Sequence, residues 1–187
     1  MVQLESDRYR FLGITIMKNR KDLAGYFRDL GYKVGAEIGV ASGDYSETLC
    51  KEIPGLKLYC VDLWQPYEAY TDYKRKSTFN KMLETTKKKL SKYNCHLIQK
   101  YSMDAVKDFV DHSLDFVYID ANHKYEYVKE DIENWVKKVN FDGVVAGHDY
   151  RTPNTGVKEA VDEFVMEHDL KLHLTDDEEP ISWYFSI

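Results

Sequence analysis

Short apolar segments alternate with longer segments along most of the chain, and the two kinds differ in periodicity. The short segments are rich in β-branched and aromatic residues and predict strands at residues 34–38, 58–61, 96–98, 116–119 and 144–146. In the longer segments apolar residues recur every three or four positions, which predicts helices at 21–30, 45–52, 77–92, 103–110, 125–139 and about 157–165. Two apolar segments close the chain at 170–174 and 182–187, and the second predicts a final strand.

Strand–helix alternation of this kind is typical of an α/β fold. Right-handed crossovers give a mostly parallel sheet with helices on both faces, which is a Rossmann-like three-layer sandwich. No repeat or low-complexity linker interrupts the pattern, so we expect one domain at 21–187 after an N-terminal extension or lid at 1–20. Ligands of such sheets bind at the carboxyl ends of the strands, which directs attention to the residues after each strand.

Composition narrows the class of protein. A formal net charge of −6 makes nucleic acid an unfavourable partner, because a phosphate backbone meets repulsion on most faces. One local exception is the lysine-rich helix at 77–92, which indicates either a solvated face or a landing surface for an acidic substrate. The pattern leaves both interpretations open.

Cysteine usage and hydropathy bear on location. The three cysteines are scattered, with no C-x-x-C pair, which favours reduced thiols and a cytoplasmic setting over a zinc knuckle. No apolar run reaches the roughly 20 residues that span a bilayer, and the first residues lack a secretory signal pattern. We therefore expect a cytoplasmic protein with no membrane partner.

A glycine-rich turn follows the first predicted strand. Residues 35–43 read G-A-E-I-G-V-A-S-G, so the segment has the form E-x-G-x-x-x-G rather than the G-x-G-x-x-G of NAD-binding folds. Gly39 and Gly43 let the backbone turn tightly and approach a ligand closely. The carboxylate of Glu37 repels a pyrophosphate and suits a cationic ligand. Asp44 and Glu47 form the spacing of a capping pair at the start of the next helix.

Polar residues also follow the second and third predicted strands. Asp62 ends the second strand, where an acid can accept both hydroxyls of a ribose. Ser102 and Met103 follow the third strand, where their side chains could contact the adenine of a nucleoside ligand. The alternative is that Asp62 and Ser102 only cap helices.

Two acids and two histidines follow the fourth and fifth predicted strands. Asp120 and His123 come after the fourth strand, and His148 and Asp149 after the fifth. Because adjacent parallel strands end at the same edge, these four side chains are expected to meet. Carboxylates with imidazoles at such a rim hold a divalent ion.

The order of these motifs resembles a known family. E-x-G-x-x-x-G, a strand-end Asp, I-D-x-x-H-x-Y-x-x-V-x-x-D-I-x-x-W, then G-H-D-Y and G-V-x-x-A-V-x-x-F together resemble the class I S-adenosylmethionine-dependent methyltransferases of the methyltransferase 24 family. That family is similar to macrolide-sugar O-methyltransferases and cephalosporin hydroxylase-like proteins. The resemblance extends from about residue 23 to the last residue and implies a seven-stranded sheet with an antiparallel last strand.

The resemblance also implies roles for individual residues. It places the S-adenosylmethionine contacts at Glu37, Gly39, Ala41, Gly43, Asp62, Leu63, Ser102, Met103 and Asp120. It implies a divalent metal, magnesium or another, at Asp120, His148 and Asp149, with His123 as general base beside Asp120. His148 departs from the family pattern, which has an acid there, and imidazole is a poor magnesium ligand.

These features together predict an O-methyltransferase acting on a small hydroxylated molecule such as a sugar or glycan residue. A cation would lower the pKa of the hydroxyl and His123 would take its proton. An aromatic lid and a facing wall for the substrate are expected from Trp64, Tyr67, Tyr70, Tyr150 and Arg151. The alternatives are an NAD-type oxidoreductase on the same fold and a non-catalytic cofactor-binding subunit.

Overall fold

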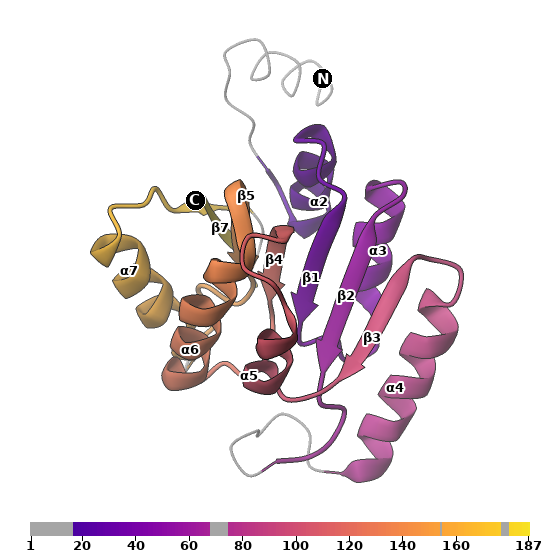
Figure 1. The fold of residues 1–187 in the computed structure, drawn as a ribbon. Helices are drawn as coiled ribbons and strands as arrows, with labels where there is room; N and C mark the ends of the chain where they lie inside the picture. The colour runs from indigo at the N-terminus through magenta and orange to yellow at the C-terminus, as the bar shows by residue number, and fades with distance from the viewer. Residues whose placement is uncertain (1–16, 68–74, 154, 177–179) are drawn as a thin grey trace, which may run out of the picture.

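The computed structural model describes residues 17–67, 75–153, 155–176 and 180–187 (Figure 1). Within this part of the chain one seven-stranded sheet has the order β3-β2-β1-β4-β5-β7-β6. Its strands are β1 (Val34–Ile38), β2 (Lys57–Asp62), β3 (Cys95–Gln99), β4 (Leu114–Ile119), β5 (Val139–Gly147), β6 (His173–Leu174) and β7 (Trp183–Ser186).

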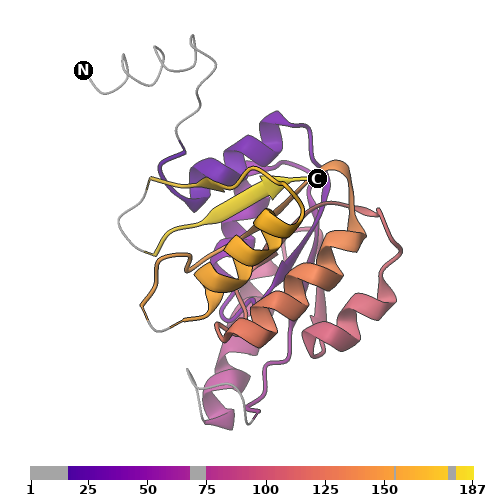
Figure 2. The same cartoon turned by 90° about the vertical axis from the view of Figure 1, so that its left-hand side faces the viewer.

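Helices cover both faces of this sheet, as Figures 1 and 2 show from two directions. One face carries α2 (Arg20–Asp29), α3 (Asp44–Glu52) and α4 (Lys76–Leu90). The other carries α5 (Ser102–Ala105), α6 (Tyr125–Trp135) and α7 (Val157–Glu167). The three-layer, Rossmann-like sandwich expected from the sequence is therefore confirmed.

The strand order creates a crevice beside β1. The chain proceeds outward from β1 to β2 and β3 on one side, and then returns to β4 on the other. All strand pairs from β3 to β5 are parallel, whereas β7 runs antiparallel to both β5 and β6, as expected for the last strand. Ligands of open α/β sheets bind at such a reversal, outside the carboxyl ends of the strands.

Side chains alternate between two hydrophobic cores along each strand. Val117 and Ile119 of β4 pack under α6 and α7, while Phe116 and Tyr118 face α2 and α3. Phe116 stacks on Phe27 of α2 with ring centroids 4.5 Å apart. Burying an apolar side chain of this size stabilises the fold by about 1.5–3 kcal/mol, so both helix layers are held by the sheet.

Two expected helices end several residues before their predicted last residues. The helix expected at 125–139 ends at Trp135, and residues 136–138 form a 3₁₀ turn before Val139 begins β5. Val139 continues the apolar spacing of the helix, but it is fully buried beside Leu114 in the sheet. Similarly, the helix expected at 103–110 is only α5 with a short 3₁₀ turn at Val106–Asp108.

The helix α3 also begins differently from the expectation. Gly43, with φ +73°, is its N-cap residue and no side chain caps the first turn. Asp44 instead pairs with Lys89 of α4 at 2.6 Å, and Glu47 pairs with Lys51 at 3.0 Å. The expected capping pair is therefore wrong: both acids serve ion pairs with neighbouring lysines.

The N-terminal part of the described chain begins just before α2. Asn19 caps this helix, because its Oδ1 accepts hydrogen bonds from the amides of Lys21 and Asp22. The expected domain boundary at residue 21 thus lies one residue after the start of α2. Most of the expected lid at 1–20 lies outside the described residues, and its role stays a prediction. No helix of the described chain combines the length and apolar character required to cross a bilayer.

Candidate functional site

Two adjoining pockets open at the carboxyl ends of the central strands. The first, the β2 pocket, encloses about 700 Å³, partly open to solvent, beside the ends of β1, β2 and β4. The second, the α3 pocket, encloses about 760 Å³ on the side of α2 and α3. Both are lined by Gly39, Ala41, Met82, Asp120 and Ala121, so a single elongated ligand can extend through both.

The floor between the pockets is the turn after β1. Gly39 has φ +90°, and a Cβ placed there would lie 2.0 Å from the carbonyl oxygen of Asp120. Only glycine allows the segments after β1 and β4 to approach this closely. Ala41 also has a positive φ of 47°, a conformation that non-glycine residues rarely adopt, so this backbone is held in place by its surroundings.

Asp62 supplies much of that support. Its Oδ2 accepts hydrogen bonds from the amides of Val40 at 3.0 Å and Ala41 at 2.9 Å, and Oδ1 accepts one from Trp64 at 2.7 Å. Burial raises the pKa of Asp62, although these amides counteract the shift. The carboxylate lines the β2 pocket beside Leu63, where it retains lone pairs for a ligand hydroxyl.

Trp64 also supports the turn after β1, through a hydrogen bond from its indole ring. Its indole Nε1 donates to the carbonyl of Ala41 at 2.8 Å, and Thr86 Oγ1 donates to the same carbonyl at 2.9 Å. Only 1% of Trp64 is exposed, and it lines neither pocket. The expectation that Trp64 covers the substrate is corrected: it is a core residue that holds the turn after β1.

At the far end of the β2 pocket, α5 and α6 are joined through Ser102. The Ser102 hydroxyl donates to Oδ1 of Asp131 and accepts from Nε1 of Trp135 at 2.8 Å. Burial raises the pKa of Asp131 to about 7. Ser102 and Asp131 line the pocket, whereas Met103, expected to contact the cofactor, packs against the core under α5 and does not line it.

Three tyrosines gather at the mouth of this pocket. Tyr67, Tyr101 and Tyr127 lie with ring centroids 6.1–6.5 Å apart and all line it. Tyr67 accepts a hydrogen bond from Asn122 Nδ2 at 3.1 Å. Tyr67, expected in an aromatic lid over the substrate, lines the β2 pocket, and its role in such a lid stays a prediction. Tyr70, expected in the same lid, lies outside the described residues.

The α3 pocket contains a buried acid and an arginine. Glu37 is 2% exposed and accepts a hydrogen bond from the hydroxyl of Ser46. Burial raises the pKa of Glu37 to about 8. Arg20, from the first turn of α2, lies 3.7 Å from Oδ2 of Asp120 and above the ring of Tyr45 at 5.1 Å. The pocket thus has both signs of charge close to the turn after β1.

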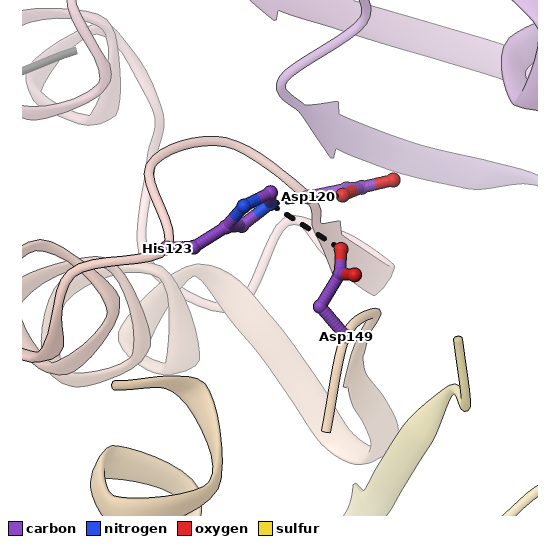
Figure 3. Close-up of side chains that lie close together, drawn as sticks. All are labelled: Asp120, His123 and Asp149. Atoms are coloured by element: carbon purple, nitrogen blue, oxygen red, sulfur yellow. Dashed lines mark ion pairs between the residues drawn. The ribbon is translucent and has the colours of Figure 1, made fainter. Parts of the chain in front are cut away.

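The four polar residues expected at the strand ends do meet, and we refer to them as the carboxylate–imidazole cluster (Asp120, His123, His148 and Asp149). His123 Nε2 lies 3.6 Å from Asp120 Oδ1 and 3.3 Å from Asp149 Oδ2. His148 Nδ1 lies 3.8 Å from Asp120 Oδ2 and 3.3 Å from Asp149 Oδ2. In Figure 3 the imidazole of His123 points toward both carboxylates.

Asp149 is the most constrained member of this cluster. Its backbone has φ +61°, and its Oδ1 accepts a hydrogen bond from Thr152 at 2.6 Å. Burial raises the pKa of its carboxyl, but hydrogen bonds from His148 and Thr152 and the nearby His123 lower it below the usual range. Asp149 is therefore an ionised acid placed between two imidazoles.

The donor atoms of the cluster suit a divalent cation. One ligand atom from each of Asp120, His123 and Asp149 lies within 4.8 Å of the other two. The set expected from the sequence had His148 in place of His123, and the structure brings both imidazoles to the carboxylates. Mixed nitrogen and oxygen donors favour manganese, iron or zinc over magnesium.

Two residues of the expected substrate wall lie elsewhere. Tyr150 is 6% exposed, and its hydroxyl donates to Asp162 of α7, which fixes the loop after β5 to that helix. Arg151 is exposed and lines neither pocket. Both expectations are corrected, because Tyr150 is bonded to α7 and neither residue lines a pocket.

Three residues of the site were not singled out from the sequence. Arg20 precedes the first strand, and no strand-end rule points to it. Asn122 lies between Asp120 and His123, where its amide bonds to Tyr67. Asp131 is the acid of the motif D-I-x-x-W, and only its burial beside the pocket reveals a polar role.

Known proteins share this fold and part of this sequence. A candidate caffeoyl-CoA O-methyltransferase of Staphylococcus aureus has a TM-score of 0.67 and 14% identity, over 100% of this chain and 92% of that one. An O-methyltransferase of Bacillus cereus in complex with S-adenosylhomocysteine has a TM-score of 0.65 and 14% identity, over 89% of this chain and 80% of that one. At these identities the likeness establishes the fold.

Sequence comparison adds a relative and a family. The uncharacterized protein y4gI of Sinorhizobium fredii is 29% identical over 110 residues, which are 59% of this chain but only 11% of that protein. The family model for methyltransferase 24, described as a methyltransferase domain, matches residues 36–150, which is more than half of the chain. The matched segment runs from within β1 to the residue that follows the carboxylate–imidazole cluster. The chain therefore belongs to the methyltransferase 24 family of class I S-adenosylmethionine-dependent methyltransferases.

Proposed function

We propose that this protein transfers the methyl group of S-adenosylmethionine to a hydroxyl oxygen of a small substrate such as a sugar or glycan residue. The observation that carries the proposal is the position of the carboxylate–imidazole cluster. Asp120 belongs to that cluster and also lines both pockets, next to the turn after β1. This position supports the presence of a proton acceptor beside the expected methyl donor, where an O-methyltransferase requires one.

Each of the two pockets is suited to a different part of the cofactor. Asp62 offers an acceptor to the ribose, and the apolar walls of the β2 pocket suit the base. Glu37, Asp120 and Arg20 of the α3 pocket suit the zwitterionic methionine part. S-adenosylmethionine supplies an electrophilic methyl group when bound, and the protein's task is to align the hydroxyl with it.

His123 is the proposed proton acceptor. Asp149 lies 3.3 Å from its Nε2 and stabilises the imidazolium that forms when a substrate hydroxyl loses its proton. Asp120 lies 3.6 Å from the same nitrogen and orients the ring from the other side. This arrangement supports acid–base chemistry without requiring any further group.

Metal assistance is a second candidate, favoured by the ligand geometry at Asp120, His123 and Asp149. A cation held there would lower the pKa of the substrate hydroxyl. The nitrogen of His123 that faces the two carboxylates serves either as a ligand or as a base, but not as both. Addition of chelator and of individual metals separates these two roles.

The cytoplasm is the proposed location. The three cysteines are free thiols in the structure, and reduced thiols are the norm in that compartment. This part of the proposal is tested by fractionating cells that express the protein at its natural level.

Calorimetry and a transfer assay test the function. Purified protein should bind S-adenosylhomocysteine and not NAD⁺, and it should move label from methyl-labelled S-adenosylmethionine to one member of a panel of sugars and phenols. His123→Ala should lower kcat by about a hundredfold to ten-thousandfold and retain the affinity for S-adenosylhomocysteine. Binding of NAD⁺ in place of S-adenosylhomocysteine would contradict the proposal, and so would full turnover in His123→Ala.

A further inference from the structure

Asp131 is a buried acid to which the proposed reaction assigns no role. It lies on α6, is 4% exposed and lines the β2 pocket at the end away from the carboxylate–imidazole cluster. A carboxylate buried this deeply is costly unless it is well paired. The hydrogen-bond partners of its two oxygens therefore determine what Asp131 can do.

One oxygen of Asp131 is occupied and the other is not. Oδ1 accepts a hydrogen bond from Ser102, whose oxygen in turn accepts one from Trp135 Nε1 at 2.8 Å. Among the described residues, Oδ2 of Asp131 has no hydrogen-bond partner. The chain Trp135–Ser102–Asp131 fixes the carboxylate, so Oδ2 is an oriented acceptor at the pocket wall.

The position of Asp131 along the pocket indicates what meets it. This step rests on the proposed function, in which the ribose lies at Asp62 and the methyl group near Asp120. The base must then continue past β2 toward β3, into the space lined by Leu63, Tyr101 and Ser102. Asp131 lines the same end of the pocket.

We propose that Asp131 recognises the 6-amino group of the adenine base and is a specificity-determining residue for the cofactor. The amino group donates a hydrogen bond to Oδ2, while Ser102 keeps Oδ1 occupied. The recognising acid thus comes from α6, and the segment after β3 contributes the hydroxyl that orients it.

This assignment makes a chemical distinction between two bases. Adenine presents a donor at position 6, whereas hypoxanthine presents a carbonyl oxygen there, which an ionised carboxylate repels. An asparagine at this position offers an amide that can turn its donor toward hypoxanthine. The preference of the protein for adenine over hypoxanthine should therefore be changed by the single substitution Asp131→Asn.

The experiment compares S-adenosylhomocysteine with S-inosylhomocysteine by calorimetry at pH 8.5, where a pKa of about 7 leaves Asp131 mainly ionised. The unmodified protein should prefer S-adenosylhomocysteine by about tenfold or more, the effect of one hydrogen bond to a charged group. Asp131→Asn should remove or reverse this preference. Glu133→Gln is the matched control, because Glu133 is on the same helix with its side chain 47% exposed.

Each outcome decides one question. Equal affinity of the unmodified protein for the two ligands overturns the assignment, and this arm does not depend on the folding of any variant. A folded Asp131→Asn variant that keeps the preference overturns it as well, and leaves Asp131 as a link between α5 and α6. If the unmodified protein binds neither ligand, the proposed function itself fails. A switched preference in Asp131→Asn, unchanged in Glu133→Gln, supports the assignment.

Discussion

His123 Nε2 and Asp149 Oδ2 lie 3.3 Å apart, although the two residues belong to loops after different strands (Figure 3). The contact exists because β4 and β5 are parallel neighbours, so that their last residues, Ile119 and Gly147, are paired. The chemistry of the cluster is thus fixed by the register of two strands.

Asp149→Asn should lower kcat by about a hundredfold or more, because the amide no longer stabilises a protonated His123. The affinity for S-adenosylhomocysteine should stay nearly unchanged, since Asp149 lines neither pocket. Single-turnover methyl transfer and calorimetry measure the two effects. Asp111→Asn, an exposed acid paired with Lys138, controls for the loss of a charge. Normal turnover in Asp149→Asn would remove Asp149 from the mechanism.

Gly39→Ala should destabilise the fold far more than Gly55→Ala. Both glycines have similar positive φ values, +90° and +80°, so both substitutions carry backbone strain. At Gly39 the added Cβ also meets the carbonyl of Asp120, whereas nothing lies within 4 Å at Gly55. The difference in free energy of unfolding should be about 2 kcal/mol or more, measured by urea titration. Equal losses would mean that the two loops separate easily.

Asp62→Ala should weaken both the fold and cofactor binding. Three backbone amides lose their acceptor, at a cost of about 1–3 kcal/mol in the free energy of unfolding. The affinity for S-adenosylhomocysteine should fall by about tenfold or more through the lost ribose contact. Urea titration and calorimetry on the same preparation give both numbers. A stability loss with unaltered affinity would restrict Asp62 to supporting the turn.

Glu37→Gln should change the pH dependence of stability. The folded-state pKa of Glu37, about 8, lies above its ordinary value of 4.5, so between these values the folded protein binds more protons than the unfolded chain. Stability from this group is therefore fully present below about pH 4.5 and is lost as pH rises toward 8. The unmodified protein should lose stability relative to Glu37→Gln across this window, by about 1 kcal/mol per pH unit at most. Parallel curves of the two proteins from pH 5 to 8 would contradict this.

Manganese or zinc should raise the melting temperature more than magnesium at equal concentration. A ligand at one hundred times its Kd stabilises a folded protein by about 2.7 kcal/mol. His123→Gln should reduce the shift, because it removes a nitrogen donor from the set of three. Scanning calorimetry with each metal after chelator treatment measures this. A shift that is equal for the three metals, or is insensitive to His123→Gln, would count against metal binding at the cluster.

Strand-end rules predicted where the acids of the candidate site lie. Asp62 ends a strand, and Asp120 and Asp149 follow strands, whose apolar residues are recognisable in the sequence. Parallel pairing brings these strand ends together. The sheet was predictable for the same reason, since buried parallel strands are nearly continuous apolar runs. These rules predict where a residue lies along the edge of the sheet.

Side-chain direction within the loops was not predictable in this way. Trp64 and Tyr150 follow strands too, but Trp64 has φ +44° and turns into the core, and Tyr150 turns toward Asp162 of α7. Neither turn has a sequence signal, because the positive φ values belong to non-glycine residues. Arg20 was missed for a different reason: its contact with Asp120 depends on where α2 packs, which no local pattern reports.

The contact of Arg20 with Asp120 couples a helix terminus to the charge of the site. Arg20 is the first residue of α2, and the end of this helix is secured by the Asn19 side chain and by a hydrogen bond from the Tyr45 hydroxyl to the Arg20 carbonyl. Unwinding of that single turn would move the guanidinium away from Asp120. The balance of positive and negative charge in the α3 pocket therefore depends on the stability of one helix end.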